Sequence, residues 1–428
     1  MKKKELRRIA VFFNATKYIP GNECIDIYEK CIKEIPFELD RTYLVQDDEL
    51  DEVLKEDKDA VCIVFPMSGS VQSSVVTTAL HFRTSIFFPA YMKGGFSDEL
   101  SERLLKANSA PAIMDSYAVA KRSSDHIEMI SSFDRIDTRI RILKAEDYIR
   151  NAKLLLIGNI EPWVVSNNRD LSVYENKLGC TIERMPYDEL IASFEKTTDE
   201  EAREIYSNFM DKVGELKSVN EDDVRRASRF AFALNKLLDD KNADGCALAC
   251  FNLIPLVGTT SCLALSYINQ KCQKLASCEG DVESLLTMLI ARKLTAYPLW
   301  MANPNLQRDG SVNFVHCTAP IRINGDMKYN LMKHHETGKG VSPEVMMPEG
   351  IEVSMLRIGN NAESFTAMKA RSIEAIHENS CRSQMHLMPE NPEGYLRTSL
   401  GCHQVMAFED ITEMFRTVCR DLDMKEVL

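Results

Sequence analysis

Short apolar runs alternate with amphipathic stretches through the first third of the chain. The runs are typical of buried strands, and we predict these at Ile9–Phe13, Thr42–Val45, Ala60–Phe65, Ser85–Phe88 and Ala112–Met114. The stretches between them each have one polar face, and we predict helices at Cys24–Ile35, Asp48–Lys55 and Ser73–His81. Strands that alternate with helices indicate a parallel sheet covered on both faces.

A second alternating segment begins near Asp147. Its predicted strands are Lys153–Gly158 and Gly245–Cys250, and its predicted helices are Asp199–Val213, Asn220–Leu238, Cys262–Gln270 and Val282–Leu294. From about Trp300 the pattern changes to short β-like pieces at Asn313–His316, Glu344–Met347, Glu352–Ile358 and Val405–Phe408, followed by a last helix at Ile411–Asp421. Turn signals such as DG, NGD and PEG separate the pieces, which indicates an antiparallel sheet or barrel.

Composition narrows the class of protein. The chain has 428 residues, with 64 acidic and 52 basic side chains and a net charge of −12. A nucleic-acid-binding protein should carry a basic patch, so we expect no nucleic-acid partner. No apolar stretch approaches the length of a membrane span, so we expect no membrane partner either. The basic start runs into a strand-like segment at Ile9–Phe13 instead of a signal-peptide core, which favours a cytoplasmic protein.

The 13 cysteines are scattered along the chain, and no CxxC pair occurs. That spacing disfavours zinc knuckles and thioredoxin-type chemistry. Scattered thiols in a large chain without a signal segment are typical of a reducing compartment. We therefore expect most of the cysteines to be small buried hydrophobic residues.

Three short motifs carry candidate chemistry. In Cys278–Asp281 (CEGD), two carboxylates flank a glycine where a strand-like run meets a helix. Such carboxylates can bind a hard cation or move a proton. For Asp281, the role of a helix N-cap is favoured over a chemical role. For Glu279, a chemical role and a purely structural role at the start of the helix are equally favoured. The other motifs are FVHCTAP, which contains His316, and GCHQ, which contains His403. Each histidine is a candidate metal ligand. The alternative for His316 is a hydrogen-bonded core residue, and the alternative for His403 is a residue of a turn.

Two further features have ordinary explanations. The pair His334-His335 lies in a polar stretch, and we expect both rings to be solvated. The loop Pro66–Ser70 (PMSGS) follows a predicted strand at the edge where open α/β sheets bind ligands. An ordinary strand-to-helix turn remains the favoured interpretation of this loop.

The segment FNLIPLVGTTSCLALSYINQKCQKLASCEGDVESLLTMLIARKLTAYPLWMANP, with NFVHCTAP after it, resembles the L-fucose isomerase and L-arabinose isomerase superfamily. The resemblance continues through TGKGVSPEVMMPEGIEVSMLRIG and LGCHQVMAFEDITEMF. It implies an α/β protein with two Rossmann-like parallel-sheet domains, followed by a β-rich, antiparallel barrel-like domain. The expected domains are 1–147, 148–300 with the CEGD motif, and 301–428 with the HC and GCH motifs.

The resemblance also implies an activity and a site. The expected function is metal-dependent aldose–ketose isomerisation of a monosaccharide, deoxy or modified sugars included, through an enediol and with Mn²⁺ as the metal. Glu279 matches the family's metal-binding, proton-shuttling glutamate, while His316 and His403 match metal-binding histidines. Asn303 stands where the family has a second acidic ligand. Asp281 is then a candidate for the second proton-transfer group.

Asn303 also motivates an alternative function. An amide oxygen can bind a hard cation, but it brings no negative charge and is not a base. The chain could therefore have kept the isomerase fold as a sugar-binding or regulatory protein without turnover. The resemblance further implies a homo-oligomer, either a trimer or a hexamer.

Overall fold

The computed structural model describes residues 6–427, so part of the basic start lies outside the described residues. The chain divides into two compact units, 1–144 and 145–428. The second unit holds both the second parallel sheet and the antiparallel strands, which the sequence analysis assigned to separate domains at 148–300 and 301–428. Each unit is described by itself.

The first unit is a five-stranded parallel sheet with the strand order β2-β1-β3-β4-β5. The strands are β1 (Arg8–Asn14), β2 (Arg41–Gln46), β3 (Val61–Pro66), β4 (Thr84–Phe87) and β5 (Ile127–Met129). The helices are α1 (Gly21–Glu34), η1 (Val53–Lys55), α2 (Gln72–His81), α3 (Asp98–Lys106), α4 (Ser109–Ser123) and α5 (Phe133–Arg150), the last of which continues into the second unit.

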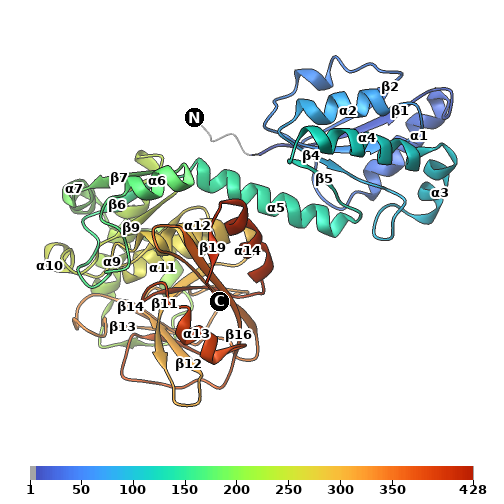
Figure 1. Cartoon of the computed structure of the whole chain (residues 1–428). Helices are drawn as coiled ribbons and strands as arrows, with labels where there is room; N and C mark the ends of the chain where they lie inside the picture. Colours follow the sequence, from blue (N-terminus) through green and yellow to red (C-terminus); the bar gives the residue numbers. More distant parts are fainter. Residues whose placement is uncertain (1–5, 428) are drawn as a thin grey trace. The chain divides into compact units, whose positions relative to one another are not determined.

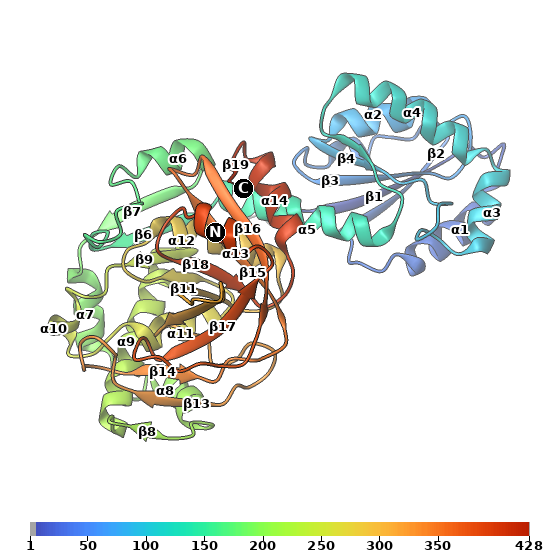
Figure 2. The same ribbon diagram turned by 60° about the horizontal axis from the view of Figure 1, so that its bottom comes forward.

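Both faces of this sheet are covered, as the apolar runs predict. Ala10 and Phe12 of β1 pack into one core with α1 and α3, whereas Ile9, Val11 and Phe13 pack into the other with α2 and α4. Successive strand residues point to opposite faces, so a strand buried on both sides must be apolar throughout. Figures 1 and 2 show the two helix layers on either side of the blue sheet.

Two predictions in this unit are wrong. Ala112–Met114 is not a strand but part of α4, where Ala112, Ile113 and Ala120 face the core. A short apolar run fits a helix face as well as a strand, and the surrounding helical residues decide between them. The predicted helix Asp48–Lys55 is reduced to the single turn η1.

The second unit contains a four-stranded parallel sheet with the order β10-β9-β6-β7. Its strands are β6 (Lys153–Ile157), β7 (Thr181–Met185), β9 (Gly245–Leu248) and β10 (Leu275–Ser277). The helices of this part are α6 (Ser172–Leu178), α7 (Asp188–Lys196), α8 (Arg203–Met210), α9 (Glu221–Asp240), α10 (Ile254–Val257), α11 (Cys262–Lys271) and α12 (Val282–Leu294).

The antiparallel strands that follow form a closed barrel. The order β15-β18-β11-β12-β17-β16 closes because β16 also pairs with β15, and β19 adds to β16 outside the ring. The strands are β11 (Leu299–Leu306), β12 (Val312–His316), β15 (Glu352–Gly359), β16 (Ser364–Ser372), β17 (Ser383–Pro389), β18 (Gln404–Ala407) and β19 (Lys425–Glu426). The predicted antiparallel barrel is therefore confirmed.

A small three-stranded sheet and two helices complete the unit. The sheet has the order β14-β13-β8 and consists of β8 (Leu216–Lys217), β13 (Tyr329–Met332) and β14 (Ser342–Val345). The helices are α13 (Pro392–Arg397) and α14 (Thr412–Asp421). No helix within residues 6–427 combines the length and the apolar character that a membrane crossing would require.

Helix α12 joins the parallel sheet to the barrel. It contacts β9 and β10 on the sheet and β11, β15 and β18 on the barrel, and Figures 1 and 2 show it between them. Only Arg292 and Lys293 near its carboxyl end are not buried. A helix that is apolar all round is typical of such a central position. Its bounds agree with the prediction, and its amino terminus places the CEGD motif between the two layers.

Candidate metal centre

The CEGD motif forms a tight turn between β10 and α12. Glu279 has φ 59° and Gly280 has φ 66°, so both lie in the left-handed region. A Cβ on Gly280 would stand 2.9 Å from Ile160 Cα, so only glycine fits there. The left-handed backbone of a glutamate costs about 1–3 kcal/mol. Backbone hydrogen bonds from Gly280 N to Leu248 O and from Glu161 N to Glu279 O hold the strained turn.

This turn brings Glu279 to the two predicted histidines. Ligand atoms of Glu279, His316 and His403 all lie within 4.8 Å of one another. Glu279 Oε1 is 3.4 Å from His403 Nε2 and 3.8 Å from His316 Nε2. The three side chains come from the end of β10, the end of β12 and the residue before β18. The group could hold a metal ion.

Each histidine ring is oriented through its other nitrogen. His403 Nδ1–H donates to Asp281 Oδ2 at 2.8 Å, and His316 Nδ1 lies 2.9 Å from the Thr318 hydroxyl. An ionised carboxylate only accepts, so a proton of His403 is on Nδ1, and Nε2 is the ring nitrogen that faces Glu279. Carboxylate–histidine pairs of this kind are typical partners of metal ions.

His403 Nε2 is the observation that tests the fit of a metal. This nitrogen is buried and has no hydrogen-bond partner among the described residues. Buried polar atoms are nearly always paired, so an orphan nitrogen facing a carboxylate calls for an explanation. A divalent cation between His403, His316 and Glu279 supplies one, because two imidazoles and a carboxylate suit Mn²⁺ as well as Zn²⁺. These three residues therefore fit the divalent metal ion that the resemblance implies.

Neighbouring charges in the site shift the pKa values of Glu279 and His403. Burial opposes the charge of Glu279, but the adjacent His316 and His403 outweigh it and hold its pKa well below the ordinary glutamate range. Burial would lower the pKa of His403, yet the hydrogen bond to Asp281 raises it well above the ordinary value. A metal ion at Nε2 would have to displace any proton from that nitrogen, so its binding would depend on pH.

Asp281 stands behind His403 and caps α12. Its side chain accepts from Ser284 N at 2.8 Å and from Arg357 Nη1 at 2.8 Å, and both ionic side chains are fully buried. Burial opposes its charge, but Arg357 and then His403 hold the pKa of Asp281 well below the usual range. The interpretation of Asp281 as the N-cap of α12 is confirmed. A role of Asp281 in proton transfer stays a prediction.

Arg357 also reaches a second buried carboxylate, Glu283 Oε2, at 3.2 Å. Burial raises the pKa of Glu283 to about 7 against the attraction of Arg357, with the charge of Asp281 adding to the effect. The sequence analysis missed Arg357 and Glu283. Neither carries a local motif, and only the packing of β15 on α12 brings them together.

Asn303 lines the same pocket as Glu279 and His316, as the resemblance implies. The pocket offers about 20 Å³ of room, which is space for roughly one water molecule or ion. Trp163, half exposed, donates from Nε1 to Glu279 Oε2 at 2.6 Å and packs edge-on against Phe251. Trp163 was not predicted, because it lies far from the motif in the sequence.

Two minor predictions can also be compared with the structure. His334 is not solvated but buried, and it lines the same pocket together with Cys262 at the start of α11. In the loop Pro66–Ser70, the Ser68 hydroxyl accepts from Ala15 N at 2.8 Å. That contact serves the turn itself, and a ligand role for the loop stays untested.

No protein-family model matches this chain, and no curated protein matches its sequence. The resemblance to the isomerases therefore stays a prediction from the motifs.

Proposed function

We propose that this protein is a metal-dependent aldose–ketose isomerase that acts on a monosaccharide through an enediol, with Mn²⁺ as its metal. The observation that carries the proposal is the orphan Nε2 of His403. It faces Glu279 beside His316, and both rings are oriented from behind. Glu279, His316 and His403 would hold the ion, with Asn303 as a neutral neighbour in the same pocket.

When bound, a divalent cation would polarise neighbouring sugar oxygens and stabilise a developing enediolate. The protein's own part is then to move a proton and to keep its groups in place. Glu279 is held ionised, so it can accept the proton from the carbon next to the carbonyl. Trp163 fixes its second oxygen, which leaves Oε1 toward the histidines. Asp281 holds a proton of His403 on Nδ1, which leaves Nε2 as the nitrogen that would bind the ion.

The small volume of the pocket sets a condition on substrate binding. Space for about one water molecule suits an ion but not a sugar. A sugar would therefore need a wider pocket, and the ring of Phe251, which lines it, and the ring of Trp163, which packs against Phe251, would have to move. Aromatic rings beside a polar site are suited to the apolar faces of a sugar.

The direct test is an aldose-to-ketose assay over a panel of sugars with added Mn²⁺. We expect Glu279→Gln to lower turnover by about 10²–10⁴-fold, because the amide can neither accept the proton nor neutralise the cation. The matched control is Glu195→Gln, an exposed glutamate of the same unit, which should keep full activity. An inactive wild-type protein that also binds no Mn²⁺ would overturn the proposal.

The alternative is a sugar-binding or regulatory protein without turnover, and Asn303 in place of a carboxylate is the observation that favours it. Thermal unfolding with each sugar separates the two, because a ligand that binds the folded state raises its stability. Stabilisation by sugar without any dependence on metal would favour the alternative.

We also propose a cytoplasmic homo-oligomer, a trimer or a hexamer. All 13 cysteines are free thiols, which agrees with a reducing compartment. Light scattering on the purified protein measures the oligomeric state, and a monomer at assay concentration would contradict it.

A further inference from the structure

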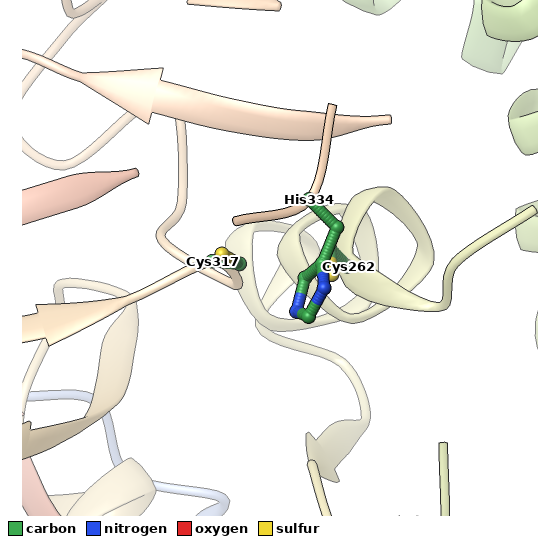
Figure 3. Close-up of side chains that lie close together, drawn as sticks. All are labelled: Cys262, Cys317 and His334. Carbon is green, nitrogen blue, oxygen red and sulfur yellow. The ribbon is translucent and has the colours of Figure 1, made fainter. Parts of the chain in front are cut away.

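A second group of metal-ligating side chains lies in the second unit. Ligand atoms of Cys262, Cys317 and His334 all lie within 4.8 Å of one another, and all three residues are buried. Figure 3 shows the three side chains close together. The residues come from the start of α11, the end of β12 and the loop after β13. None of them belongs to the Glu279 group.

Cys381 is a further thiol beside this group. The Cys317 thiol interacts with Cys262, with Cys381 and with His334. Cys381 precedes β17, and it lines the same pocket as the other three residues. The group within 4.8 Å consists of Cys262, Cys317 and His334, and Cys381 is the neighbouring thiol that would complete a set of four ligands.

Hydrogen bonding among the thiols does not account for the whole arrangement. Thiols are weak donors and acceptors, and a largely buried cluster of them gains little from such contacts. The His334 ring is fixed by its own loop, since Nδ1 lies 3.2 Å from the Thr337 hydroxyl. A metal-ligating histidine typically has such a partner on its ring.

We propose that Cys262, Cys317, Cys381 and His334 bind one Zn²⁺ ion in a closed tetrahedral site. Three thiolates with one imidazole form a common structural zinc set, and soft sulfur ligands select zinc over Mn²⁺ or Mg²⁺. Because all four positions are taken by the protein, the ion is structural. It ties α11 to the ends of barrel strands that also line the Glu279 pocket.

This site does not depend on the isomerase activity. Cys317 follows His316 directly in the chain, so the two centres share one strand end while their ligands are separate. The ligand spacing explains why no CxxC pair reveals the site. The thiolates become neighbours only when the barrel closes and α11 packs against it.

The test begins with the wild-type protein, purified without chelators from zinc-supplemented medium. Elemental analysis should find about one zinc per chain. Exchange of zinc for Co²⁺ should produce thiolate-to-cobalt charge-transfer absorption and the strong visible bands of a tetrahedral site. Neither measurement needs a variant, so a misfolded mutant cannot obscure the result.

Variants then identify the ligands. Cys317→Ser and Cys381→Ser should lose the zinc and the cobalt spectrum, whereas Glu279→Gln should keep both. The matched control is Cys246→Ser, a fully buried cysteine of β9 outside the group. This variant also places a hydroxyl group in the interior, so its loss of folding stability should be similar, but it should retain zinc.

Several results would overturn the proposal. One is wild-type protein without zinc and without a cobalt spectrum. Another is a disulfide among Cys262, Cys317 and Cys381 in peptide maps of the unreduced protein. Zinc that is lost from Glu279→Gln but kept by Cys317→Ser would place the ion in the other centre. Zinc kept by Cys381→Ser would overturn the four-ligand set.

Discussion

Replacement of Asp281 by Asn tests how the site prepares His403. Every hydrogen bond of the Asp281 side chain is accepted from a donor: His403 Nδ1–H and Arg357 Nη1 at 2.8 Å, and Ser284 through its backbone and hydroxyl. The asparagine side chain has nearly the same shape, but one of its ends is an NH₂ donor. The substitution therefore changes charge and hydrogen bonding with little change in packing.

Either orientation of the amide is unfavourable. If its oxygen faces His403, the NH₂ meets the Ser284 N–H and the cap of α12 is lost, at about 0.5–2 kcal/mol. If its NH₂ faces His403, the ring must accept at Nδ1 and carry its proton on Nε2, where a metal cannot bind. In both cases Arg357 loses the negative charge of one of its two buried partners, for which the loss of folding stability is roughly 3–5 kcal/mol.

Metal affinity is the decisive readout. Loss of the partner that orients a histidine ligand typically costs 10–100-fold in affinity, or about 1.4–2.8 kcal/mol. We expect calorimetric titration with Mn²⁺ to show a loss in this range for Asp281→Asn. Circular dichroism establishes that the variant is folded before the titration.

Glu283→Gln is the matched control, because Glu283 also pairs with Arg357 but does not touch His403. It should lower stability while leaving Mn²⁺ affinity near that of the wild type. Wild-type affinity in Asp281→Asn would refute the orienting role of Asp281. An equal loss in both variants would show that the effect passes through Arg357 and not through His403.

Three further predictions concern separate parts of the chain. Burial opposes the charge of Glu56, but Tyr43 and two arginines lower its pKa to about 2. The first unit should then lose up to about 3 kcal/mol as the pH falls from 5 toward 2, and Glu56→Gln should flatten that loss in hydrogen exchange. Gly280→Ala should cost at least about 1 kcal/mol more in urea unfolding than Gly325→Ala, since both have positive φ but only Gly280 is crowded; equal losses would contradict this. Asn303→Asp should tighten Mn²⁺ binding about tenfold by adding a charge, and unchanged affinity would show that Asn303 is not a ligand.

The regular elements could largely be predicted from local patterns. The helix Val282–Leu294 has the predicted bounds, and Ile9–Phe13 lies within β1, because a long apolar run leaves few alternatives. The short run Ala112–Met114 shows the limit of this approach. Three apolar residues fit either a strand or a helix face, and the packing of α4 on the sheet decides the matter.

The candidate site was only partly predictable. The motifs indicated Glu279, Asp281, His316 and His403, whose chemistry is visible as residue types in a short context. Trp163 and Arg357 had no such context, and their contacts with Glu279 and Asp281 join segments far apart in the chain. His334 was predicted to be solvated because its neighbours are polar, but its loop folds into the interior.

By itself, the sequence determined the alternation of strands and helices, the change to antiparallel strands near Trp300 and the identity of the chemical groups. Only the tertiary structure decided which of these groups meet. Barrel closure and the packing of α11 and α12 bring Glu279 close to two histidines. The same packing brings Cys317 close to His334 and to two further thiols. The physical reason is that hydrophobic patterning acts over a few residues, whereas ligand distances depend on how distant segments pack.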